Sequence, residues 1–199
     1  LVAQRFNFQY VDTGVMYRAV TWLVHFLRFD IESTKELEKQ IIDNPMSILN
    51  KMGTQISIGG KVLESELRTP MIDQSVSEVS KIGIVRQLLV AQHRRLASTE
   101  AGIVMVGRDI GTVVLVDADL KFYLDASVEK RAERRVIDRI RMGSPTTLQE
   151  MMNEITERDL IDTTRENSPL TAAEDSTIID TDYLDQNAVA ELIVQYAKK

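Results

Sequence analysis

Cysteine is absent from this sequence of 199 residues, which excludes disulfide bonds and thiolate metal sites. Long apolar runs are absent too: none approaches the roughly 18 residues that span a bilayer, and no basic segment followed by an apolar one opens the chain. The lack of cysteine agrees with a reducing compartment. We therefore expect a cytoplasmic protein that does not enter a membrane.

An excess of positive charge is also lacking, because the formal net charge is −6. This argues against non-specific binding to nucleic acid or anionic membranes. Arginine nevertheless occurs in local groups, at Arg68 and Arg86, at Arg94 and Arg95, at Arg131, Arg134 and Arg135, and at Arg158 and Arg165. Each group could be a solvated helix face paired with glutamate. Together they favour local pockets for small phosphorylated molecules, because one guanidinium group can donate two parallel hydrogen bonds to the oxygens of a phosphate.

Apolar runs of buried-strand type predict the main fold. They lie at residues 102–106, 121–124 and 176–179, whereas residues 8–11 alternate toward a short strand, and helical segments such as residues 15–28 lie between the strands. Alternating strands and helices predict an α/β fold with a mostly parallel sheet. Ligands of such sheets bind beyond the carboxyl ends of the strands.

Two segments depart from this alternation. Residues 55–58 and 61–63 flank Gly59-Gly60, a strong signal for an antiparallel hairpin, which predicts an inserted lobe at residues 33–85. Residues 127–168 are highly charged and helical, with a break at residues 143–145. This second segment can be an exposed helical hairpin, a lid that closes over a substrate, or both.

Polar residues follow two of the predicted strands. Asp12 and Thr13 come after the first, with Arg18 in the next helix, and Arg108 and Asp109 follow the strand at residues 102–106. Each set by itself could be a helix cap with a surface arginine. Their repetition where a parallel sheet gathers its ligands favours a binding site.

A third candidate set lies in the charged helical segment. Arg158, Asp162 and Arg165 follow i, i+4, i+7 spacing, which places them on one face of a helix. A carboxylate among arginines can keep a guanidinium cluster oriented.

Four segments resemble bacterial cytidylate kinases in order and at similar spacing: VDTGVMYR, GRDIGTVV, ASVEKRAERR and ERDLIDTTRENSPL. The likeness extends to LRTP and STIIDT and covers essentially the whole chain. It implies a three-layer parallel sheet of the phosphate-binding-loop kinase type, with an antiparallel nucleoside-monophosphate-binding insert and a helical lid. The implied division is a core of residues 1–32, 86–126 and 169–199, the CMP-binding insert 33–85 and the lid 127–168.

The resemblance also implies an activity, the transfer of the γ-phosphoryl group of Mg²⁺-bound ATP to CMP or dCMP. Its motifs carry over to Thr13, Arg18, Ser77, Arg86, Arg108, Asp109, Asp162 and Arg165 for the substrate, and to Arg158, Arg131 and Arg135 for catalysis. Asp109 would read cytosine with Ser77 and Arg86, because a carboxylate accepts from the amino group that uracil lacks. This set counts against a UMP or dTMP kinase.

The sequence departs from the family at two places. No G-x-x-x-x-G-K-[ST] loop occurs, and the chain opens within a helix, so we expect the ATP-phosphate loop to precede Leu1 in the natural protein. As written, the chain should not turn over. Val106 stands where many relatives carry an acidic residue. Magnesium would then be bound by the loop, by water, or by Asp12 or Asp109, and the sequence does not assign the ligands among them.

Four other predictions remain. A non-catalytic CMP-binding protein, truly lacking the loop, is the alternative to the kinase, and a monomer is the expected state. His25 and His93 lie on apolar or mixed helices without a metal-ligand pattern, which favours packing or surface roles. Arg94 and Arg95 at a helix end favour compensation of the helix dipole over RNA contact.

Overall fold

The computed structural model describes residues 1–31, 33–53 and 55–198. The chain divides into two compact units, one of Ala3–Val116 and one of Asp117–Lys199 with Leu1–Val2. The first is the larger unit and the second is the smaller unit. The division into core, insert and lid remains a prediction.

The larger unit contains the first predicted strand, loop and helix. After the short helix α1 (Val2–Phe6), strand β1 (Gln9–Asp12) leads directly into helix α2 (Thr13–Leu27). Strand β1 pairs in parallel with β5 (Ile103–Val106), and Asp12 is in register with Val106. The carboxyl ends of both strands therefore meet at one edge, as the sequence predicts for a ligand-binding site.

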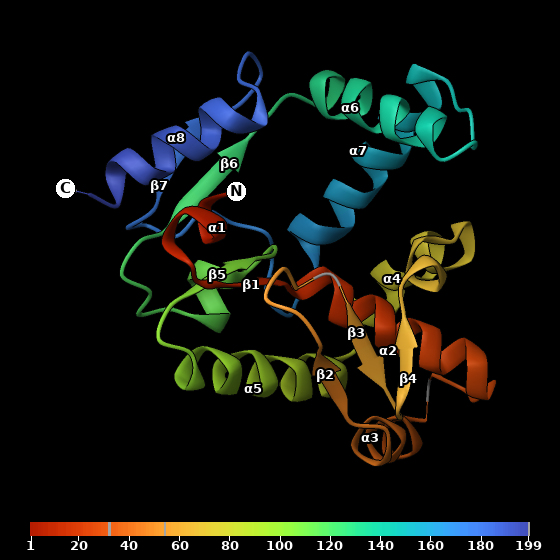
Figure 1. Ribbon diagram of the computed structural model, residues 1–199. Coiled ribbons are helices and arrows are strands. Elements are labelled where there is room, and N and C mark those ends of the chain that lie inside the picture. The colour runs from red at the N-terminus through yellow and green to blue at the C-terminus, as the bar shows by residue number, and fades with distance from the viewer. Residues whose placement is uncertain (32, 54, 199) are drawn as a thin grey trace. The chain divides into compact units, whose positions relative to one another are not determined.

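An antiparallel sheet of three strands lies beside α2 in this unit (Figure 1). Its order is β2 (Met46–Ile48), β3 (Ile56–Ile58) and β4 (Lys61–Leu63). The turn between β3 and β4 uses Gly59 at φ 56° and Gly60 at φ 80°, so both glycines adopt the left-handed backbone of a tight hairpin. The predicted hairpin is confirmed, whereas β2 was not predicted because a strand so short leaves almost no alternation to read.

Helix α2 forms the centre of the hydrophobic core. Met16, Val20 and Leu23 on this helix are at most 2% exposed. Around it pack α4 (Pro70–Lys81), the 3₁₀ helix η1 (Ser65–Arg68), strand β3 and α5 (Gly83–Thr99), while α3 (Thr34–Asp43) packs against α5. Full burial of each such apolar side chain contributes about 1.5–3 kcal/mol, so the core holds α2 and α4 at fixed positions.

The smaller unit has its own parallel pair of strands. Strand β6 (Phe122–Asp125) pairs with β7 (Thr177–Asp180), and helix α8 (Gln186–Tyr196) follows. The rings of Phe122 and Tyr196 pack edge to face with their centroids 5.8 Å apart, and this contact holds α8 against the strand pair.

A helical hairpin lies between these two strands in the sequence. It consists of α6 (Val128–Arg141) and α7 (Leu148–Thr164), which pack against each other. The turn contains Gly143 at φ 74°, where the sequence predicts a break. Helix α7 begins with a capping box, because the Thr147 side chain accepts from the Glu150 amide and the Glu150 side chain accepts from the Thr147 amide.

The α/β class with parallel strands, an antiparallel sheet and helices is confirmed. One detail differs from the prediction, because the parallel strands form two separate sheets of two strands rather than one sheet. A sheet is continuous only where neighbouring strands exchange backbone hydrogen bonds, and no strand in the described ranges bridges β5 and β6. Within the same ranges, no helix is both long and apolar enough to cross a bilayer.

Candidate functional site

The first part of the candidate site lies where β1 and β5 end. Asp12 caps α2 by accepting a hydrogen bond of 2.9 Å from the Gly14 amide, and the Thr13 hydroxyl donates to the Val106 carbonyl at 3.0 Å. A β-carbon on Gly107 would lie 2.4 Å from the Thr13 Oγ1 atom. The two motifs predicted to meet are therefore in direct contact, and only glycine fits at position 107.

Arg18 connects α2 to the start of α4. Its Nη1 atom lies 2.6 Å from Asp73 Oδ1 and donates to the Leu67 carbonyl at 2.9 Å. Asp73 lies in the first turn of α4, where the helix dipole favours negative charge. Sequence reasoning missed Asp73; its place just after Thr69-Pro70, a helix start signal, was the available clue.

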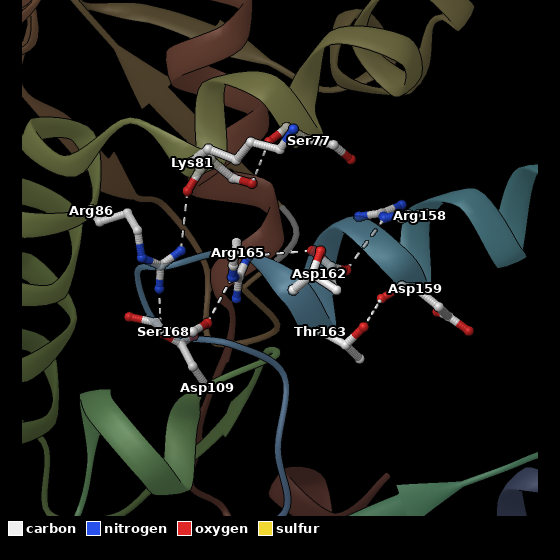
Figure 2. Close-up of polar contacts among 12 residues, drawn as sticks. Ser77, Lys81, Arg86, Asp109, Arg158, Asp159, Asp162, Thr163, Arg165 and Ser168 are labelled. Atoms are coloured by element: carbon white, nitrogen blue, oxygen red, sulfur yellow. Dashed lines mark hydrogen bonds and ion pairs between the residues drawn. The ribbon is translucent and has the colours of Figure 1, made fainter.

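A buried ion pair forms the centre of the larger unit's polar cluster (Figure 2). The Arg86 guanidinium binds the Asp109 carboxylate, and both residues are 5% exposed. Arg86 also donates to the Ser80 carbonyl at 3.2 Å and lies 5.6 Å from the centre of the Tyr17 ring. Removing one partner would leave an uncompensated buried charge, which typically costs 3–5 kcal/mol.

Helix α4 holds Ser77 between these contacts. Asp73 in its first turn binds Arg18, and the Ser80 carbonyl near its end binds Arg86, so half-buried Ser77 lies between two guanidinium groups along α4. Arg108 is exposed. The larger unit thus places Thr13, Arg18, Ser77, Arg86 and Asp109 around α2 and α4.

The smaller unit carries the other predicted set on α7 (Figure 2). Asp162, only 3% exposed, accepts from Arg165 at 3.3 Å and lies 3.9 Å from the Arg158 Nε atom. Arg165 also donates to the Ser168 carbonyl at 2.7 Å. The predicted common face is therefore present, with a buried carboxylate between two arginines.

Arg131 and Arg135 both lie on α6 but differ in surroundings. Arg131 donates to both carboxylate oxygens of Asp159, at 2.9 and 2.6 Å, and to the Ala126 carbonyl at 3.1 Å. The hydrogen bonds to Asp159 raise the pKa of Arg131 above its ordinary value. Arg135 is exposed. Sequence reasoning missed Asp159, although it directly follows Arg158 in a motif it had selected.

A metal site formed by protein groups alone is not present among the described residues, since no three His, Asp or Glu side chains gather there. Asp12 is occupied with capping α2 and Asp109 with Arg86. His93 is fully buried, as a packing role predicts, and His25 lies 3.0 Å from the Ser75 hydroxyl.

Comparison with known proteins agrees with the four motifs. The profile of the family described as cytidylate kinase matches residues 1–199. The chain is 38% identical to the cytidylate kinase of Lactococcus lactis over 200 residues, covering 100% of this chain and 90% of the relative. It is 41% identical over 201 residues to the cytidylate kinase of Desulforamulus reducens, covering 100% and 89%.

A third relative is the bifunctional pantoate ligase/cytidylate kinase of Prochlorococcus marinus, 40% identical over 195 residues, which are 96% of this chain and 37% of the relative. Because the family profile and full-length relatives agree from end to end, this chain belongs to the cytidylate kinase family.

Proposed function

We propose that this protein transfers the γ-phosphoryl group of ATP to CMP or dCMP, giving CDP or dCDP and ADP. The observation that carries the proposal is the buried pair of Arg86 and Asp109 beside Ser77 and Arg18, in a chain of the cytidylate kinase family. Family membership favours this enzyme over a non-catalytic CMP-binding protein. We further propose a cytoplasmic monomer, and the absence of cysteine agrees with a reducing compartment.

Asp109 would select the base. Arg86 binds its Oδ2 atom and holds the carboxylate in a fixed orientation, so Oδ1 can accept a hydrogen bond from the amino group of cytosine. Uracil presents a carbonyl at that position, and two acceptors facing each other without a proton are unfavourable. Ser77 would complete the base contact from α4.

Arg18 would bind the substrate phosphate. In the structure its guanidinium is held by Asp73 and the Leu67 carbonyl, so it is already oriented at the start of α4. A dianionic phosphate offers more acceptor oxygens than Asp73 does and would be the stronger partner. Thr13, held against Val106 at the strand end, would line the same position, and exposed Arg108 would add charge.

The arginines of the smaller unit would stabilise the transferring phosphates. Arg158 and Arg165 are oriented by buried Asp162, and Arg131 is held by Asp159, so these side chains are pre-organised before substrate binds. Phosphoryl transfer requires positioning and neutralisation of charge rather than a strong base. Magnesium supplied with ATP would neutralise part of the phosphate charge, and we assign it no protein ligand.

The test uses the complete product of the gene, verified by intact mass. ATP-dependent phosphorylation is measured with CMP, dCMP, UMP and dTMP, for the wild type, Asp109→Asn and the exposed control Asp119→Asn. We expect CMP and dCMP to be preferred, and kcat/KM for CMP to fall about 10–100-fold in Asp109→Asn only, as expected for loss of a hydrogen bond to a charged group. Equal use of UMP by the wild type would contradict the proposal.

A further inference from the structure

Arg94 lies on α5 beyond Arg86 and contacts the segment that follows Asp109. Its Nε atom donates to the Val114 carbonyl at 3.0 Å, and its Nη2 atom donates to the Val113 carbonyl at 2.6 Å. Two donors of one guanidinium group are thus committed to two consecutive backbone carbonyls. Neither of these contacts is to an anion, in contrast to the contacts that Arg86 and Arg131 make with Asp109 and Asp159.

The contacted carbonyls end the π-helical turn η2 (Ile110–Val114), which begins immediately after Asp109. The amides of Val113 and Val114 donate to the Asp109 carbonyl at 2.9 and 3.2 Å, and the Leu115 amide donates to the Ile110 carbonyl at 2.7 Å. The last carbonyls of a helical turn have no partner within the turn. Arg94 supplies partners for two of them.

Helix α5 therefore holds this turn at both ends. Arg86 binds the Asp109 side chain at its start, and Arg94 binds the Val113 and Val114 carbonyls at its end. The two arginines are eight residues apart on a continuous helix, a separation of about 12 Å along its axis. Because α5 is rigid over this distance, the two attachments fix the backbone position and direction of Asp109.

The choice of arginine has a physical reason. A guanidinium group presents several N–H donors in a planar fork, whereas the lysine ammonium is a compact point charge on a flexible stem. A lysine at position 94 could bind one carbonyl but could not hold both in a defined geometry. The turn would then gain freedom at the end opposite Arg86.

We propose that Arg94 is a positioning residue for base selection: by fixing the turn that follows Asp109, it sets where the Asp109 carboxylate meets the substrate base. The inference rests on the proposed role of Asp109 in reading cytosine. Arg94 itself contacts no substrate in this account. Its loss should therefore change the discrimination between CMP and UMP more than it changes kcat at saturating CMP.

The experiment compares Arg94→Met and Arg94→Lys with Arg95→Met, which removes the neighbouring arginine; both arginines are exposed. In the complete enzyme, kcat and KM are measured for CMP and UMP. We expect the ratio of kcat/KM for CMP to kcat/KM for UMP to fall about 10-fold in Arg94→Met, through a higher KM for CMP. A 10-fold change corresponds to a loss of about 1.4 kcal/mol in the binding free energy of CMP relative to UMP. Arg94→Lys should recover part of the ratio, and Arg95→Met should keep it.

Hydrogen exchange gives a readout that does not depend on catalysis. The Val113 and Val114 amides, which donate to the Asp109 carbonyl, should exchange faster in Arg94→Met while amides of α2 do not change. If Arg94→Met does not fold, the same measurements on Arg94→Lys decide. A lower melting temperature with an unchanged CMP to UMP ratio would overturn the inference and leave Arg94 a purely structural role.

The two proposals fail separately. If Asp109→Asn leaves the CMP to UMP ratio unchanged, the proposed role of Asp109 is wrong, and the inference about Arg94 falls with it. If Asp109→Asn lowers the ratio but the Arg94 variants do not, only the inference about Arg94 is wrong.

Discussion

His93 makes the stability of this protein depend on pH in a way that can be calculated. Its side chain is fully buried on α5, and neither ring nitrogen has a hydrogen-bond partner among the described residues. The centroid of the Tyr17 ring lies 6.3 Å from the centroid of the His93 ring. Burial first, and the positive charge of Arg86 second, lower the pKa of His93 from 6.5 to about 4. The folded protein therefore keeps the imidazole neutral in the range where the unfolded chain binds a proton.

The sign and size of the effect follow from proton linkage. Between the folded pKa of about 4 and the unfolded pKa of 6.5, the unfolded state binds more protons, so the free energy of unfolding falls as the pH is lowered. From pH 7 to pH 5 the expected loss is about 2 kcal/mol. Above pH 7 the histidine should contribute almost no pH dependence, because both states are then neutral.

The assay is urea unfolding at pH 5, 6 and 7 for the wild type and His93→Leu, which cannot titrate at this position. The difference in unfolding free energy between the two proteins isolates His93 from other groups. Repeating the comparison in a His25→Gln background removes the other histidine as a source. A wild-type minus His93→Leu difference that stays constant from pH 7 to pH 5 would refute the reasoning, since it would mean that His93 titrates alike in both states.

Three further predictions follow from local geometry. Gly107→Ala should lower the unfolding free energy by about 1–3 kcal/mol, because the new β-carbon would lie 2.4 Å from Thr13 Oγ1. The control Gly83→Ala should be tolerated, because nothing else lies within 4 Å of the β-carbon there. Equal unfolding free energies of the two variants in chemical denaturation would contradict this prediction. A double-mutant cycle of Arg131→Met and Asp159→Asn should give a coupling energy of about 1 kcal/mol from their paired hydrogen bonds, and a coupling near zero would argue that the pair does not hold α6 to α7. Thr147→Ala should destabilise the start of α7 by about 1 kcal/mol and speed exchange of the Glu150 amide, whereas Thr146→Ala, which leaves that cap in place, should not.

The local elements of the fold could be predicted because their causes are local. Two adjacent glycines at Gly59 and Gly60 favour a tight hairpin wherever they occur between alternating residues, and the structure has that hairpin. The break near Gly143 and the face shared by Arg158, Asp162 and Arg165 likewise follow from residue types and helical periodicity. The same holds for Asp12, whose side chain caps the helix that begins directly after it.

The partners of the site residues could not be predicted in the same way. Asp73 for Arg18 and Asp159 for Arg131 are selected by the packing of helices distant in the sequence. The sequence context of Arg94 favoured compensation of the negative end of the helix dipole. In the structure its guanidinium group instead binds the Val113 and Val114 carbonyls of η2. Many acidic residues and carbonyls were available to each arginine, and sequence spacing does not rank them.

By itself, the sequence determined the chemical types present, the family, the local helices and turns, and the segments from which a nucleotide site is drawn. Only the tertiary structure decided which side chains form pairs, that Arg86 and Asp109 are buried together, and that His93 is enclosed without a polar partner among the described residues. The reason is physical. Local backbone preferences depend on neighbours in the chain, whereas burial and pairing depend on how the hydrophobic faces of separate elements pack together.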